Sequence, residues 1–335
     1  MITTWFVLIA GLWTGYFILE GFDFGVGVLL PVLGRDERER QVLLTTIGPV
    51  WDGNEVWVIT AAGATFAAFP DWYAGLFSAF YLPLLAILVA LILRGLALEY
   101  RGKRPDPPWR RRWDRAIVAG SLVPALGWGL VFADLAHGLP LSTGHEYRAG
   151  PLGLLTLAGI LGGLALLGLC ATHGALFLAL KTTGAPRVRA AALAARVGWP
   201  TTGLTVALLV ALVDARSGRA AVATVVLAVL VVVVALALTG ALLANRAGRE
   251  GWAFAGTALG IAATVATVFA ALYPEVLPAT NLPVGLTVSG AAASPYALKI
   301  MSWAAALFAP LVLLYQGWTY WVFRRRVTVE PAAVS

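Results

Sequence analysis

Residues 220–244 read AAVATVVLAVLVVVVALALTGALLA, a run without a single charged side chain. A transmembrane helix needs about 20 mostly apolar residues, because lipid offers no hydrogen-bond partner to an unpaired backbone amide. This run is therefore predicted to span a membrane. Similar runs, bounded by charge, proline or glycine, are predicted at 4–33, 49–69, 73–99, 114–135, 151–181, 195–213, 251–273 and 296–323. The sequence thus predicts an all-α integral membrane protein with about nine transmembrane helices.

The composition supports this class and argues against others. Of 335 residues, 60% are hydrophobic and 12% are charged, whereas ordinary soluble domains have roughly 25% charged residues. The net charge of +7 does not indicate a nucleic-acid partner, because the basic residues form short clusters between apolar runs. Cys170 is the single cysteine, which excludes disulfides within the chain and cysteine-rich metal sites. The first 13 residues lack a basic region and a small-residue cleavage site, so the first run is expected to be retained.

The distribution of positive charge predicts the orientation. All but four of the 24 Lys and Arg residues fall in alternate loops and after the last span, the exceptions being Arg148, Arg216, Arg219 and Lys299. Short basic loops stay in the cytoplasm. The N-terminus is therefore expected outside and the C-terminus in the cytoplasm. We expect one polytopic membrane domain over 1–335, with a first four-helix bundle at 1–135, a second at 151–273 and a peripheral helix at 296–323.

Ionisable residues inside the spans indicate a functional site, because an unshielded charge in a membrane costs at least a few kcal/mol. Glu20 and Asp23 are three residues apart, on one face of the first helix. With the predicted orientation, the first three spans bring polar groups to one depth in the cytoplasmic half, namely Glu20, Asp23, Asp52, Asn54, Glu55, Arg94 and Glu99. A polar file that opens to the cytoplasm and ends inside the membrane favours proton intake over complete passage.

Simpler interpretations of these residues stay open. In one of them, Arg94 pairs with an acid only to neutralise buried charge. In another, Asp52 caps the second predicted span. The acids of the outer half, Asp134 among them, are expected at loops or helix ends that water reaches. His173, the one histidine inside a span, is interpreted as a hydrogen-bonded residue near a helix end. Haem ligation is the alternative for His173, although the sequence offers no convincing second ligand.

Three segments in the first third of the chain carry a family resemblance: GFDFGVG at 21–27, GPVWDGNEVW at 48–57 and GATFAAFP at 63–70. They closely resemble subunit II of the cytochrome bd-type quinol oxidases. The match continues at Phe80–Pro83, Arg94, Glu99–Arg101, Trp113–Asp114, His173–Ala175 and Lys181–Gly184. It is weaker after about residue 190, where Tyr273–Pro274 and Met301–Trp303 still resemble the family.

The resemblance implies a membrane enzyme that oxidises quinol and reduces dioxygen to water in the bacterial cytoplasmic (inner) membrane. Subunit I would carry two haems b, haem d and the quinol site, and would form a pseudo-symmetric heterodimer with this chain, which would ligate no cofactor. The resemblance also allows small single-helix accessory subunits, bound lipid and a quinone in the complex. Subunit II would stabilise subunit I and supply a cytoplasmic proton path at the positions of Glu20, Asp52, Arg94 and Glu99. Such an enzyme generates proton motive force without pumping.

The chain departs from the family pattern at three of these positions. Some relatives have aspartate where this chain has Glu20 and Glu99, and others have an amide at Glu55, which leaves the role of Glu55 open. Two other classes of protein remain as alternatives: a secondary transporter or channel, since these also bury acids in their helices, and a purely structural partner.

Overall fold

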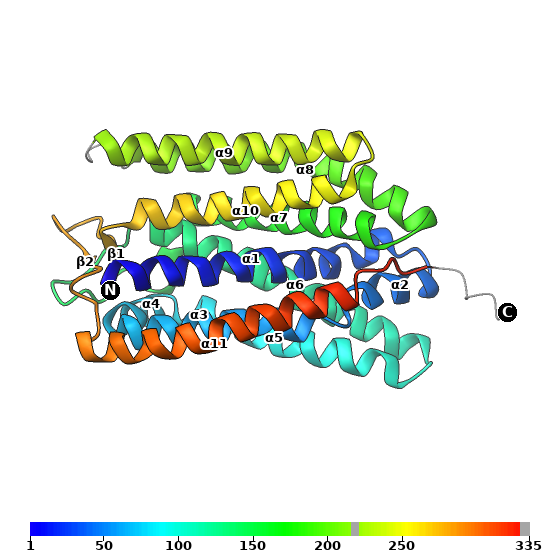
Figure 1. Cartoon of the computed structure of the whole chain (residues 1–335), viewed down its shortest axis with the longest axis horizontal. Coiled ribbons are helices and arrows are strands. Elements are labelled where there is room, and N and C mark those ends of the chain that lie inside the picture. The colour runs from blue at the N-terminus through cyan, green and yellow to red at the C-terminus, as the bar shows by residue number, and fades with distance from the viewer. Residues whose placement is uncertain (216–220, 329–335) are drawn as a thin grey trace.

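The computed structural model describes residues 1–215 and 221–328, and its elements confirm the all-α class (Figure 1). The predicted loop residues Arg216 and Arg219, and the first residue of the predicted span 220–244, lie outside the described residues. The helices are α1 (Ile2–Leu33), α2 (Glu37–Ile47), α3 (Trp51–Ala68), α4 (Pro70–Ala79), α5 (Tyr81–Tyr100), α6 (Pro107–His137), α7 (Leu157–Lys181), α8 (Gly184–Ala215), α9 (Ala221–Arg246), α10 (Glu250–Leu272) and α11 (Pro295–Val322). Short 3-10 helices cover Arg101–Lys103 and Pro151–Leu154, and the strands β1 (Glu275–Leu277) and β2 (Leu286–Thr287) form an antiparallel pair.

Eight helices in the described part of the chain are long and apolar enough to cross a membrane: α1, α5, α6, α7, α8, α9, α10 and α11. The remaining predicted span, 49–69, corresponds to α3, which has 18 residues and packs against α1. Its first five residues include Asp52, Asn54 and Glu55, which lower its hydropathy. We treat α3 as part of the membrane bundle because it runs among the long helices (Figure 1).

Two local features differ from the predicted spans. The predicted span 73–99 is divided at Phe80 into α4 and α5. Pro83 explains the break, because it has no N–H to donate to the carbonyl of Ala79 and so cannot continue the helix. The short helix α2 was not predicted, and it starts where the Asp36 side chain accepts a hydrogen bond from the Glu39 backbone N–H at 2.8 Å. This is an ordinary N-cap.

The central helix is α1, which packs against α3, α6, α7 and α10. Its contact with α7 depends on glycine. A Cβ atom added to Gly25 would lie 2.0 Å from the carbonyl oxygen of Cys170, and one added to Gly174 would lie 2.6 Å from the Cα of Gly25. The two backbones therefore approach as small residues allow in membrane bundles.

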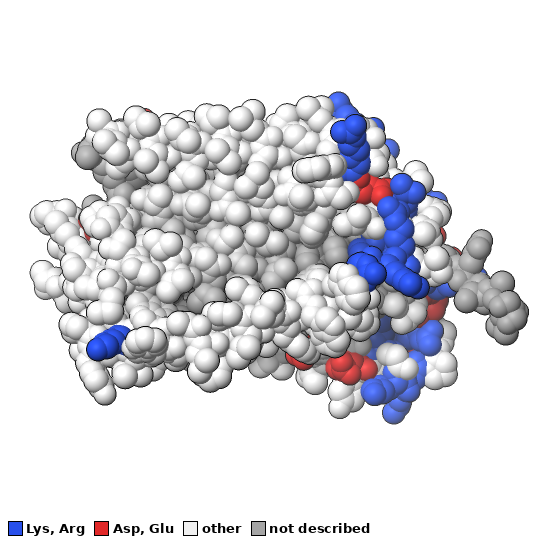
Figure 2. All heavy atoms as spheres, in the orientation of Figure 1, with Lys and Arg blue, Asp and Glu red and all other residues white. Residues whose placement is uncertain are grey.

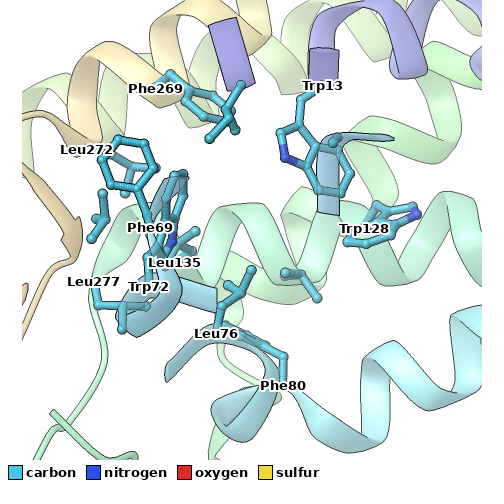
Figure 3. Packing of buried hydrophobic residues seen from close by; sticks show 14 of the residues in the cluster. Trp13, Phe69, Trp72, Leu76, Phe80, Trp128, Leu135, Phe269, Leu272 and Leu277 are labelled. Atoms are coloured by element: carbon cyan, nitrogen blue, oxygen red, sulfur yellow. The ribbon is translucent and has the colours of Figure 1, made fainter. Parts of the chain in front are cut away.

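A large aromatic core fills the half of the bundle near the N-terminus (Figure 3). Trp13 of α1 lies against Trp128 of α6 with ring centroids 4.8 Å apart, and Trp72 and Phe269 bring α4 and α10 into the same cluster. This core joins helices of both predicted four-helix groups.

The helix α11 is the least enclosed element of the bundle, and Leu298 is its one fully buried residue. The segment after α11 crosses the end of the bundle. The Val327 backbone N–H donates to the Lys181 carbonyl at 2.7 Å, and Arg326 contacts a Glu250 carboxylate oxygen at 2.5 Å. We call residues 323–328 the C-terminal strap, since they tie α11 to the ends of α7 and α10.

Most of the visible Lys and Arg side chains gather at the end of the molecule where α11 finishes (Figure 2). The N-terminus lies at the opposite end (Figure 1). This segregation of charge along the bundle axis is what the positive-inside rule expects of the cytoplasmic end. The orientation itself stays a prediction.

Candidate functional site

The centre of the candidate site is an ion pair between Glu20 of α1 and Arg94 of α5. The Glu20 side chain is 0% exposed and that of Arg94 is 1% exposed. Gly120 of α6 makes room for the guanidinium stem, because a Cβ atom there would lie 2.6 Å from the Arg94 Cβ. The ring of Phe24 lies 4.9 Å from the Arg94 Cζ, which adds a cation–π contact.

Glu55 of α3 is the second acid near Arg94. Its Oε2 lies 3.4 Å from an Arg94 terminal nitrogen, and its side chain is 21% exposed. Arg94, the cation of the buried ion pair, therefore has a second partner, Glu55, that reaches the surface of the chain. Arg94 bridges the two acids, so a single cation serves both.

A second arm of the site starts at Asp23, which is fully buried one helical turn after Glu20. Its Oδ2 accepts a hydrogen bond from the Asn54 side-chain amide at 2.8 Å, and the same NH₂ group lies 3.3 Å from the Leu19 carbonyl. The other end of the Asn54 amide, Oδ1, accepts hydrogen bonds from Tyr320 at 2.7 Å and Gln316 at 3.1 Å. Both donors belong to α11.

Several buried polar atoms around the site have no hydrogen-bond partner within residues 1–215 and 221–328: Glu20 Oε2, Asp23 Oδ1, Arg94 Nε and Nη1, and Ser121 Oγ. Buried polar groups are nearly always paired, with protein or with ordered water. A cluster of such atoms is the kind of polar surface on which buried water is held.

The structure brings together five of the seven predicted site residues: Glu20, Asp23, Asn54, Glu55 and Arg94. It does not bring Asp52 and Glu99 to them. Both are exposed, and neither forms a hydrogen bond or ion pair with a described residue.

The cause is helical rotation, because 3.6 residues make one turn. Glu99 follows Arg94 by five residues and so lies on another face of α5. Asp52 is turned away from Asn54, but it shares the partly exposed face of α3 with Glu55, three residues later, and its side chain ends at the surface. Asp52 does not act as a cap either, since α3 has no side-chain cap. Depth alone therefore does not decide which of these side chains meet, because it leaves out rotation about the helix axis.

The sequence reasoning missed Gln316 and Tyr320. A signal was available, because the two polar side chains are four residues apart in an apolar run and therefore share one helix face. Their partner could not be found in this way, since Asn54 precedes them by 262 and 266 residues.

His173 holds three helices together and is fully buried. One ring nitrogen pairs with the Thr257 hydroxyl at 2.7 Å and the other with the Ile18 carbonyl at 3.1 Å, while the ring stacks on Phe254. The predicted hydrogen bonding of His173 is confirmed, but its predicted place near a helix end is wrong, because it is fully buried within α7. Both nitrogens already have partners, so this residue does not fit a haem ligand. Within the described residues, no three His, Cys, Asp or Glu side chains group to hold a metal ion.

Asp134 also differs from its predicted environment. It was expected where water reaches it, but it is 1% exposed and accepts a hydrogen bond from the Thr156 hydroxyl. The reason is that Thr156 caps the start of α7 and brings the chain over the end of α6.

Taken together, fold and site define a polytopic α-helical membrane protein with an arginine shared by buried acids. A family model described as "Cytochrome bd terminal oxidase subunit II" matches residues 1–323. The chain therefore belongs to the family of cytochrome bd terminal oxidase subunit II.

Individual relatives agree with this family. The chain is 40% identical over 334 residues to "Cytochrome bd ubiquinol oxidase subunit 2" of Bacillus subtilis, covering 97% of this chain and 96% of the relative. It is 34% identical over 359 residues to "Cytochrome bd-I ubiquinol oxidase subunit 2" of Escherichia coli K12, covering 97% and 95%. A bd oxidase structure from Geobacillus thermodenitrificans has the same fold, with a TM-score of 0.75, 18% identity and 96% of each chain covered.

Membership makes this chain a component of a quinol oxidase complex, which is an oxidoreductase of the respiratory chain. It also places the chain in the bacterial inner membrane as a multi-pass protein, in agreement with its long apolar helices. A subunit I partner is implied by the same relatives.

Proposed function

We propose that this subunit conveys protons from the cytoplasm to a haem-bearing subunit I, where dioxygen is reduced to water, and that it stabilises that subunit. The observation that carries the proposal is the buried cluster of Glu20, Asp23 and Arg94, with Glu55 between the cluster and the surface. A buried carboxyl group that can bind and release a proton is what a relay through a membrane needs.

The balance of charge supports a relay over a simple neutralising pair. One guanidinium faces three carboxyl groups, those of Glu20, Glu55 and Asp23. If all three were ionised, the site would hold a net charge of −2 in a poorly solvated place, which is strongly unfavourable. The site is therefore expected to keep a proton at rest and to exchange it.

A direction follows from exposure. Glu55 is partly exposed and receives protons, and Glu20 is enclosed and passes them on. Asp23 lies beside Asn54, one turn closer than Glu20 to the cytoplasmic end of α1. Asp52 and Glu99, exposed on the same helices, stay outside the relay and collect protons at most. Protons taken from the cytoplasm and electrons taken from quinol on the outer side meet in subunit I, so turnover builds a membrane potential without pumping.

The haems belong to the partner in this proposal. Two haems b and one haem d would supply the electron transfer and oxygen chemistry there, and no residue of this chain is assigned to them. The contribution of this chain is a set of positioned carboxyl groups and a packed surface.

The test is quinol-driven oxygen consumption by the purified complex with Glu20→Gln. Glutamine keeps the size of the side chain and removes the exchangeable proton, so turnover is expected to fall at least tenfold while the haem spectrum of the complex stays unchanged. Glu99→Gln is the matched control, because Glu99 is exposed, and it should retain most of the turnover. Full activity in Glu20→Gln would refute the relay.

A further inference from the structure

We propose that Gln316 and Tyr320 of α11 are positioning residues that fix the Asn54 amide with its NH₂ group toward Asp23, so that Asp23 is held as a hydrogen-bond acceptor beside Glu20. This inference rests on the proposed function, because it assigns α11 a part in the same relay. It adds the peripheral helix to a site otherwise built from α1, α3 and α5.

The orientation of the Asn54 amide follows from its neighbours. An amide has one accepting end and one donating end, and which is which must be inferred from the hydrogen-bond network. The Leu19 carbonyl can only accept, and an ionised Asp23 carboxylate can only accept, so the NH₂ group must face these two. The accepting oxygen then faces α11.

The α11 donors hold that arrangement from the other end. Tyr320 donates its hydroxyl and Gln316 its amide NH₂ to the same oxygen of Asn54, at 2.7 and 3.1 Å. Two donors on one oxygen oppose a turn of the amide, because Gln316 would have to turn its own amide and Tyr320 its hydroxyl at the same time, while oxygen would meet oxygen at Leu19. Asn54 itself is 0% exposed, so bulk water does not reach its amide.

The position of the pair on α11 makes these contacts stand out. Most residues of α11 from Leu307 to Trp318 are exposed, and the helix packs loosely on the bundle. Gln316 and Tyr320 are partly buried on its inner face. A glutamine in a membrane helix is unfavourable unless it finds a polar partner, and here its partner is the residue that bonds Asp23.

The chemical consequence concerns Asp23. A fixed N–H donor stabilises the charged form of a carboxylate. If the amide turns, its oxygen faces Asp23, which then gains a hydrogen bond only when it carries a proton. The α11 pair therefore biases Asp23 toward giving up its proton, although neither side chain touches Asp23.

The test is a set of variants in the intact complex. Tyr320→Phe combined with Gln316→Leu is expected to lower quinol oxidase turnover about fivefold, the change that corresponds to one neutral hydrogen bond. Tyr315→Phe is the matched control, since Tyr315 is an exposed tyrosine of the same helix, and it should leave turnover unchanged. The haem content of each complex checks assembly, and Tyr320→Phe alone serves if the double variant assembles poorly.

Two readouts separate positioning from a merely structural role. In an Asn54→Leu background, the double substitution should have no further effect on turnover, because the α11 pair acts through Asn54. The infrared C=O stretching band that disappears in Asp23→Asn should shift in the double variant and stay in place in Tyr315→Phe. Additive losses of turnover, or an unmoved band, would overturn the inference.

The outcomes also separate this inference from the proposed function. Loss of turnover in Glu20→Gln with full turnover in the α11 double variant would leave the relay standing and refute the positioning role. Full turnover in Glu20→Gln would refute both.

Discussion

At the scale of single residues, Arg94 supplies the positive charge that allows two acids to lie close together. Its guanidinium pairs with Glu20 and lies 3.4 Å from Glu55. A buried ion pair is costly to build, but removing one partner is worse, because it leaves an uncompensated charge. The cost of burying these acids in their charged form therefore depends on this one cation.

We predict that Arg94→Leu destabilises the complex by about 3–5 kcal/mol, since it leaves Glu20 buried without its partner. The measurement is the thermal unfolding of the purified complex, together with its haem content. Arg104→Leu is a suitable control, because Arg104 is exposed and packs on Trp109. Equal stability of the two variants would contradict the assigned role of Arg94.

A pH-dependent prediction concerns Glu39 of α2, outside the membrane-spanning helices. A hydrogen bond from Arg189, at 2.6 Å, lowers the pKa of Glu39 below the ordinary value of 4.5. A carboxyl group with a lowered folded pKa adds stability above its unfolded pKa, and this stability is lost as pH falls through the folded value. Glu39→Gln should therefore lower the melting temperature at pH 7 and have a shrinking effect below about pH 4.5. Melting curves across this range test it, and a difference that is independent of pH would argue against the pair.

At the scale of elements, the closest approach is between α1 and α7, at Gly25 and Gly174. Cys170 and Gly174 leave no space for a Cβ atom on Gly25. Since α1 carries both Glu20 and Asp23, the contact also sets where these acids lie relative to α5. Helix packing and the geometry of the site are thus coupled.

We predict that Gly25→Ala destabilises the complex by about 1–3 kcal/mol, the usual effect of forcing an extra methyl group into a packed core. Gly203→Ala is the matched control, because a Cβ atom there meets nothing within 4 Å and alanine favours the helix. Melting temperatures of the two complexes give the comparison. A Gly25→Ala complex as stable as the control would show that α1 and α7 can separate freely.

At the scale of the whole molecule, charge is segregated along the bundle axis. The basic residues gather at the end that holds the C-terminal strap, and the N-terminus lies at the other (Figures 1 and 2). The buried acids of α1 lie in the second half of that helix, toward the basic end. An orientation with this end in the cytoplasm supplies the relay from the side where protons are to be taken up.

Cysteine labelling tests this orientation. Cys170 is buried and is not expected to react, so a cysteine introduced on the surface reports its own side. Arg104→Cys should react with a membrane-impermeant maleimide only in inside-out vesicles, and Thr143→Cys only in right-side-out vesicles. The reverse pattern would overturn the orientation and, with it, the cytoplasmic origin of the relay.

The sequence predicted those features of the site that depend on one helix alone, and it missed those that depend on how helices pack together. Glu20, Asp23 and Arg94 stand out because each is a charge within an apolar run. Asp52 and Glu99 have the same signal, yet Glu99 is turned away from Arg94, and Asp52 ends at the surface one turn before Glu55. The contact between Asn54 and α11 depends on how distant helices pack, which spacing along the chain does not encode.

The bonds from α11 to Asn54 also order events during synthesis. Asn54 meets Tyr320 across 266 residues, so the acids of the first helix enter the membrane long before their last neighbours leave the ribosome. Until then the Asn54 amide lacks its two donors from α11, and the strap that secures α11 is made later still. An unfinished chain therefore carries its acids without the fitted neighbours of the completed fold.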